Sequence, residues 1–181
     1  MKAQADVKAG EVATVSVKLE RQGEGKPVAE KQERPHDVAR AADASAKSRE
    51  QVEAMPKYNG DPNRFTAAAG VVTDKLLGID WQRGDADKNV VWQAAKDHCR
   101  SLELAGQRGW RLPTIAERVS TIDRTRPERQ SIAAVFQNSA SWFWSATPSH
   151  GGSAWLVLFD FGDADDYDIS VVRAIRVRCV R

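Results

Sequence analysis

The sequence has no apolar run long enough to cross a bilayer, since a membrane helix needs about 20 mostly apolar residues. Residues 1–6 also lack the apolar core of a signal peptide. Neither sign of charge predominates, since 27 basic and 25 acidic residues give a net charge of +2. We therefore expect no membrane insertion and no nucleic-acid binding. The chain is either a protein that stays inside the cell or a piece of a longer exported one.

Catalytic and metal-binding patterns are scarce. The 3 histidines and 2 cysteines show no zinc-site spacing. His98 and Cys99 are neighbours, so on a helix they point about 100° apart and form no nucleophile–base pair. We expect the protein not to be an enzyme and to need no cofactor.

Aromatic residues are almost absent before residue 65. All 6 tryptophans and 5 phenylalanines lie at or after it, and Tyr58 alone precedes it. Because a core needs large apolar side chains, we place the core in residues 65–181.

The residues ahead of this core divide into two regions. Residues 1–20 contain one amphipathic strand at 11–20, which either docks on a sheet edge or is the remnant of an upstream domain. Residues 21–62 are a charged linker or a solvated helix. A helix over 36–55 that packs or self-associates stays open, because its apolar stripe is thin.

Within residues 63–181 the patterns alternate between strand and helix. Strands are expected at 71–74, 79–81, 109–112, 141–147, 154–161 and 171–180, with turns at 148–152 and 162–168. The first helix runs over 91–104 with Gly106 as its C-cap and Cys99 pointing inward. Pro113 ends a strand that contains Trp110 and Leu112, and Thr114 with Glu117 forms a capping box for the second helix.

This order, with several short motifs in register, resembles the Legionella collagen-like protein C-terminal domain family, a domain of unknown function. The matching pieces are NRF (63–65), VTD (72–74), LGIDWQ (77–82), WQAA (92–95) with Cys99, WRLPT (110–114) with Glu117, WFWSAT (142–147), AW (154–155) and VRCVR (177–181). The resemblance implies an α+β class and a C-type lectin-like fold, with two helices packed on small antiparallel sheets behind an N-terminal strand and linker.

The same resemblance implies a Cys99–Cys179 disulfide and a ligand-binding module. Closing a loop of this length stabilises by about 4–5 kcal/mol in the chain-entropy model. A disulfide indicates an oxidising compartment, so we expect an extracellular or cell-surface protein. The alternative is a pair of reduced buried cysteines in a cytosolic protein.

We expect a glycan or protein ligand to bind loops and strands within 145–176. The candidate ligand-binding residues are Trp144, Ser149, His150, Trp155, Asp163, Asp165, Asp166, Tyr167, Asp168, Arg173 and Arg176. The aspartates, with Asp160, could offer oxygen ligands to Ca²⁺, but a solvated acidic turn is favoured. Arg124, Arg126 and Arg129 with Arg173 and Arg176 form either a patch for sulfated polysaccharide or balanced surface charge.

Two other functions stay open. The run over 162–170 contains residue types found in variable proteins of diversity-generating retroelements, which share this fold and vary near the C-terminus. A structural assembly domain of an envelope protein, acting as a homo-oligomer, is the third class.

Overall fold

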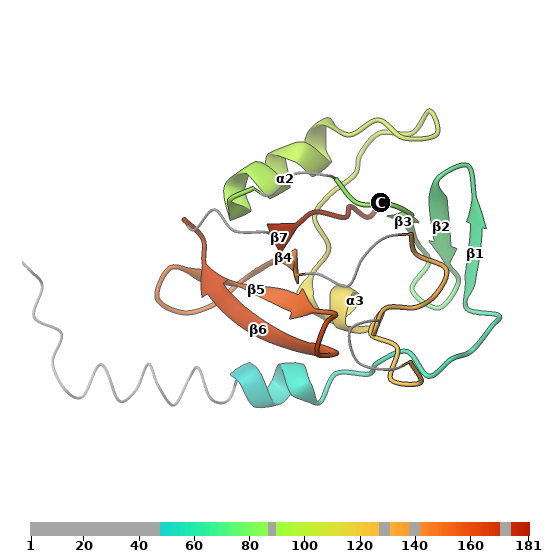
Figure 1. The fold of residues 1–181 in the computed structure, drawn as a ribbon. Coiled ribbons are helices and arrows are strands. Elements are labelled where there is room, and N and C mark those ends of the chain that lie inside the picture. Colours follow the sequence, from blue (N-terminus) through green and yellow to red (C-terminus); the bar gives the residue numbers. More distant parts are fainter. Residues whose placement is uncertain (1–47, 87–89, 127–130, 138–141, 171–174) are drawn as a thin grey trace, which may run out of the picture. The chain divides into compact units, whose positions relative to one another are not determined.

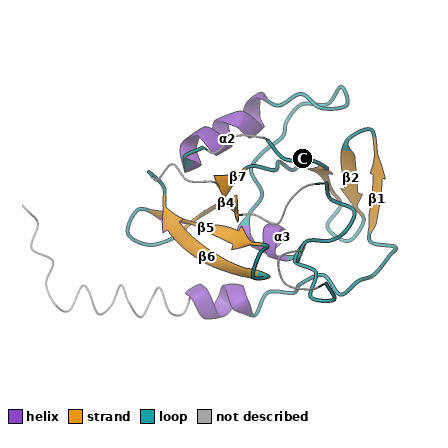
Figure 2. Cartoon of the chain, in the orientation of Figure 1, coloured by secondary structure: helices purple, strands orange, loops and turns teal. Residues whose placement is uncertain are grey.

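The described residues form a three-stranded sheet, a four-stranded sheet and three helices, shown by sequence position in Figure 1 and by element type in Figure 2. The computed structural model describes residues 48–86, 90–126, 131–137, 142–170 and 175–181, all within the unit Arg34–Arg181. The strands are β1 (Phe65–Ala68), β2 (Val71–Asp74), β3 (Ile79–Gln82), β4 (Trp142–Pro148), β5 (Ser153–Leu158), β6 (Asp163–Asp168) and β7 (Ile175–Arg176). The helices are α2 (Trp92–Ser101) and α3 (Ile115–Val119), and residues 48–53 are also helical.

The predicted α+β class is confirmed. The predicted strand at 11–20 and the linker up to residue 47 lie outside the described residues. In the part of the chain that is described, no helix has the length and apolar character to cross a membrane.

The three-stranded sheet runs β1-β2-β3, with antiparallel neighbours. β1, which the sequence patterns did not predict, joins β2 through a two-residue turn at Ala69 and Gly70, with φ of 50° and 80°. Positive φ at both positions matches the turn that best fits the twist of paired strands. The chain end lies beside this sheet, where Asp80 and Arg181 exchange backbone hydrogen bonds of 2.9 and 2.8 Å.

The four-stranded sheet runs β6-β5-β4-β7, and β7 is parallel to β4. β5 is buried on both faces, which explains why it is apolar from Ala154 to Leu158. Trp155 and Val157 face the core formed with α3, whereas Ala154 and Leu156 face the core beside α2.

The Cys99–Cys179 disulfide predicted from the family resemblance is present, with Cα atoms 5.5 Å apart. It joins α2 to the end of the chain, and both half-cystines are fully buried. The polypeptide between them spans 80 positions, so the bond closes most of the domain into one loop.

Residues 48–58 pack on the domain. For the described part of the predicted helix over 36–55, this favours packing over a solvated helix. Val52 is 5% exposed and belongs to the core that contains Trp81 and Trp155. Arg49 forms an ion pair with Asp165 at 2.7 Å and lies 5.9 Å from the centre of the Trp155 ring.

Four element predictions need correction. The helix over 91–104 ends at Ser101, because Leu102 is extended and its N–H bonds to the Cys99 carbonyl. Gly106 is therefore not a C-cap; it forms a tight turn with Ala105, closed by paired hydrogen bonds between Leu104 and Gln107.

The other corrections concern strands. The strand at 109–112 is reduced to one bridge, Arg111 to Val180, although Trp110 and Leu112 are buried as the alternation predicts. A strand was also predicted at 171–180. In the described part of that range, β7 comprises only Ile175 and Arg176. The predicted acidic turn at 162–168 is β6, fully paired with β5. As a sheet edge, this strand tolerates aspartates, which discourage pairing with another chain.

Candidate ligand-binding site

Two tryptophans of the predicted ligand face belong to the core. Trp144 is fully buried and donates from Nε1 to the Val90 carbonyl over 2.9 Å, and Trp155 is 4% exposed. Burial at this level leaves little of either indole open to a sugar ring, which argues against these two predicted ligand contacts. Trp142, which shares the face of Trp144, is half-buried and meets Tyr167 edge-on at 5.9 Å.

The predicted polar residues between β4 and β5 lie at a tight turn. Ser149 and His150 are half-buried, and the Ser149 N–H donates to the Ser153 carbonyl over 2.8 Å. Ser149 Oγ and His150 Nδ1 are buried without a hydrogen-bond partner among the described residues.

The aspartates of β6 bind different partners within the chain and do not converge on one point. Asp165 and Asp166 both accept Arg49, at 2.7 and 3.0 Å. Asp168 accepts the Ser170 hydroxyl over 2.6 Å and its N–H over 2.7 Å, and these bonds lower the pKa of Asp168. Asp163 Oδ1 accepts the Ala164 N–H. Across the described ranges, no three acidic, histidine or cysteine side chains gather as a metal site would need.

Among the described residues, the arginines of the predicted basic patch do not form one group. Arg176 forms an ion pair of 2.9 Å with the buried carboxylate of Asp85. Arg124 and Arg126 line a separate pocket that also contains Glu53 and Asp163. Arg129 and Arg173 lie outside the described residues.

A different surface of the described residues forms an apolar hollow. This hollow, the Leu76 groove, has a volume of about 820 Å³, which falls in the usual range for ligand pockets. Its lining comes from residues 55–59, 61, 63–64, 75–77, 116–117 and 120. Leu76 and Leu77 are 72% and 40% exposed, two of the three large apolar side chains left open to solvent in the described chain.

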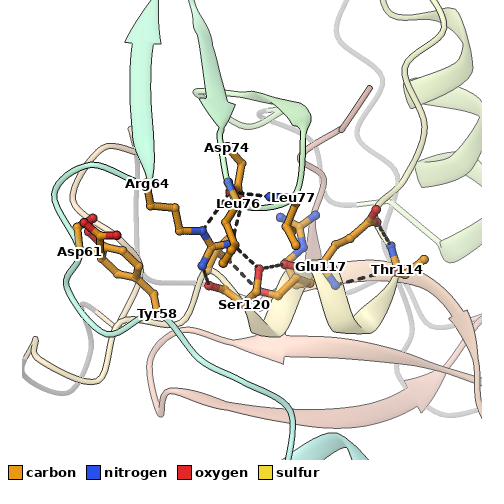
Figure 3. A network of polar contacts seen from close by, with 11 residues as sticks. Tyr58, Asp61, Arg64, Asp74, Leu76, Leu77, Thr114, Glu117 and Ser120 are labelled. Atoms are coloured by element: carbon orange, nitrogen blue, oxygen red, sulfur yellow. Dashed lines mark hydrogen bonds and ion pairs between the residues drawn. The ribbon is translucent and has the colours of Figure 1, made fainter.

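Figure 3 shows an ion pair between Arg64, which lines the groove, and Asp74, which is hydrogen-bonded to the turn of the two leucines. Arg64 donates to the two carboxylate oxygens of Asp74 over 3.0 and 2.6 Å, and both side chains are buried. Asp74 Oδ1 also accepts the backbone N–H groups of Leu76 and Leu77. A buried carboxylate needs such partners, so it orders the turn that carries the exposed leucines.

The remaining bonds of Arg64 tie the groove to α3. Its Nη1 donates to the Ser120 carbonyl over 2.7 Å, and its Nη2 donates to Ser120 Oγ over 2.8 Å. Its guanidinium carbon lies 4.6 Å from the centre of the Phe65 ring. The guanidinium thus connects β1, the turn after β2 and the end of α3.

Glu117 and Tyr58 line the groove on different sides of this pair. Glu117 closes the predicted capping box by accepting the Thr114 N–H over 2.7 Å, and Arg111 pairs with it at 2.6 Å. Burial opposes its ionisation, but the bonds from Arg111 and Thr114 outweigh burial and lower the pKa of Glu117. Tyr58 donates to the Asp61 carbonyl over 2.6 Å, and burial raises the pKa of its phenol.

Sequence reasoning missed this groove because its lining comes from segments far apart in the chain. The one local signal is a pair of leucines inside a turn, after Asp74 and before Gly78. Gly78 has a φ of 66°, which is typical of a tight turn. In such a turn, neighbouring side chains have little room to pack against the core. An apolar pair held in a tight turn marks an exposed apolar surface.

Fold and site together define a disulfide-closed α+β domain that carries an apolar groove. The sequence profile of the Lcl C-terminal domain matches residues 70–181. The chain therefore belongs to the Lcl C-terminal domain family, as the sequence motifs predicted. No curated protein and no solved structure matches the chain, so the C-type lectin-like fold stays a prediction.

Proposed function

We propose that the domain is a non-enzymatic recognition module of a bacterial surface or secreted protein, which binds a glycan or a protein. The observation that supports this most is the Leu76 groove, because exposed leucines held over an ordered polar base are typical of a binding surface. The disulfide between α2 and the chain end supports export to an oxidising compartment.

The β4–β5 turn and the outer positions of β6 are a second contact area in this proposal. Ser149, His150 and Tyr167 are half-buried there, and Asp163 and Asp168 are exposed. Arg176 is also half-buried, but it lies on β7 at the opposite edge of the sheet. Polar groups that keep part of their surface in water suit the hydrogen bonding of a glycan better than the buried tryptophans do.

A direct test presents the purified, oxidised chain to a glycan array that includes sulfated polysaccharides, and to a displayed peptide library. We expect saturable binding to members of one of the two sets, with the bound ligand recovered chemically unchanged by mass spectrometry. Failure on both sets, or conversion of a ligand to a product, would contradict the proposal.

A variable protein of a diversity-generating retroelement is the second candidate. It is favoured by the position of the run 162–170, because β6 is an edge strand whose outward side chains vary at little cost to the core. A reverse transcriptase gene nearby, with a near-copy of the last part of the gene differing at adenines, would establish it. A structural assembly domain is the third, and light scattering after size exclusion would reveal its obligate oligomer.

A further inference from the structure

From the charges around the Leu76 groove we infer that its ligand is an acidic polypeptide segment that presents large apolar side chains. This inference rests on the proposed recognition function and names the partner class and the site. The apolar part of the ligand contacts Leu76 and Leu77, and its carboxylates face Lys57 and Lys75.

The groove has more unpaired positive charge than negative charge. Its charged lining residues are Lys57, Asp61, Arg64, Lys75 and Glu117. Arg64 is taken up by Asp74, and Glu117 by Arg111. Neither lysine lies within ion-pair distance of a carboxylate in the described ranges, which leaves two ammonium groups against the single carboxylate of Asp61.

Lys57 lines both the groove and the neighbouring pocket that contains Arg124. Burial and the charge of Arg124 lower the pKa of Lys57, and they outweigh the opposing effect of Asp163 and Glu53. A cation that is disfavoured in this way gains from an added carboxylate, which supplies the opposite charge that the site lacks.

The groove combines apolar and charged lining residues. Its apolar lining includes the exposed Leu76 and Leu77 and the half-buried Met55 and Tyr58. A polypeptide places alternating apolar and acidic side chains along an extended or helical segment and so satisfies both requirements at once. Part of this lining, residues 55–64, precedes the matched residues 70–181, so the site is a property of the longer chain.

The test is a selection of random displayed peptides on the oxidised full chain, followed by fluorescence anisotropy with the enriched peptides. We expect the enriched peptides to combine leucine or phenylalanine with aspartate or glutamate. Leu76→Ser should weaken their binding about tenfold or more, because the contact of one large apolar side chain is lost. Lys75→Glu should weaken binding by a similar factor and select basic peptides instead.

Matched controls separate this site from the rest of the surface. Phe161→Ser removes another exposed apolar side chain, 69% exposed and outside the groove, and should leave the affinity unchanged. Arg100→Glu reverses an exposed charge on α2 and should do the same. Circular dichroism and the melting temperature should match the wild type for all four variants, because each changed side chain lies at the surface.

Several results would overturn the inference. Enriched peptides that bind Leu76→Ser and Lys75→Glu as well as the wild type would place the ligand elsewhere and leave the recognition function standing. Self-association that Leu76→Ser abolishes would make the occupant a second copy of the chain. Binding of anionic vesicles or free fatty acids in competition with the peptides would make it a lipid. Failure to enrich any peptide would also reject the inference, while the glycan array would still decide the recognition function.

Discussion

Arg118 donates from Nη2 to the backbone carbonyl of Arg178 over 2.7 Å, and the side chains of both arginines are fully buried. Both stack on Phe143, with centroid distances of 5.2 and 4.9 Å. Burial and the charge of Arg178 lower the pKa of Arg118 well below its usual range. Burial lowers the pKa of Arg178 to about 10. The core therefore contains two cations, balanced by carbonyl dipoles and aromatic rings more than by carboxylates.

Replacing Arg118 tests whether its charge or its volume stabilises the core. Arg118→Ala should lower the free energy of unfolding by about 3–5 kcal/mol, because it leaves a cavity under Trp81 and Phe143. Arg118→Met should cost within about 1.5 kcal/mol, since it keeps the volume and removes a buried charge. Urea unfolding at pH 7 measures both, with Arg100→Met as the exposed control. If methionine were as damaging as alanine, the bonds to the carbonyls would be the main contribution.

Removing the disulfide should lower the free energy of unfolding more than most other changes in the molecule. The double variant Cys99→Ala and Cys179→Ala should lose about 4–5 kcal/mol, as expected for a cross-link that closes a loop of 80 positions. The wild type in excess reductant should approach the same stability in urea unfolding. Two titratable thiols in the native, oxidised protein would contradict the bond itself.

Glu117 predicts a specific response to acid. Because the pKa of Glu117 is lowered in the folded state, its stabilising effect is present above its unfolded pKa of about 4.3. That effect is lost as the pH falls through the folded pKa. Glu117→Gln should therefore cost about 1 kcal/mol at pH 7, since Arg111 is partly exposed.

The same variant should lose less stability than the wild type on acidification, and the two should converge as the pH falls through the lowered pKa of Glu117 in the folded state. Thermal unfolding followed across this range shows the convergence. A difference that stayed constant with pH would mean that the carboxylate charge has no part in the contact.

Two glycines with the same φ of 66° separate backbone conformation from packing. A Cβ at Gly78 would meet nothing within 4 Å, so Gly78→Ala should cost about 1–2 kcal/mol for the left-handed backbone alone. A Cβ at Gly162 would lie 3.1 Å from Ser131 Oγ, so Gly162→Ala should cost about 1–3 kcal/mol more. Equal shifts in the urea midpoint would mean that Ser131 yields without cost.

Local patterns predicted the parts of the fold that depend on neighbouring residues. The capping box of Thr114 and Glu117 needs only one helical turn, and the burial of Trp110 and Leu112 needs only strand alternation. The disulfide came from the family resemblance instead, since no local pattern pairs Cys99 with Cys179.

The failures arose where distant partners decide the structure. Aspartates have low strand propensity, yet β6 forms because β5 offers it a complete edge to pair with. The groove was missed for the same reason: Leu76 is exposed because Arg64 and Asp74 hold its turn, and that contact is not visible in a local pattern.

The contact between Arg64 and Asp74 has a practical consequence for anyone who expresses this domain. A fragment cut at residue 70, where the family match begins, would keep the fully buried Asp74 and discard the guanidinium that neutralises it. Such a truncation leaves an unpaired charge in the interior, at a penalty of about 3–5 kcal/mol. It also removes Val52 from the core that contains Trp155. Recombinant boundaries are therefore better placed at or before residue 48 than at the edge of the family profile.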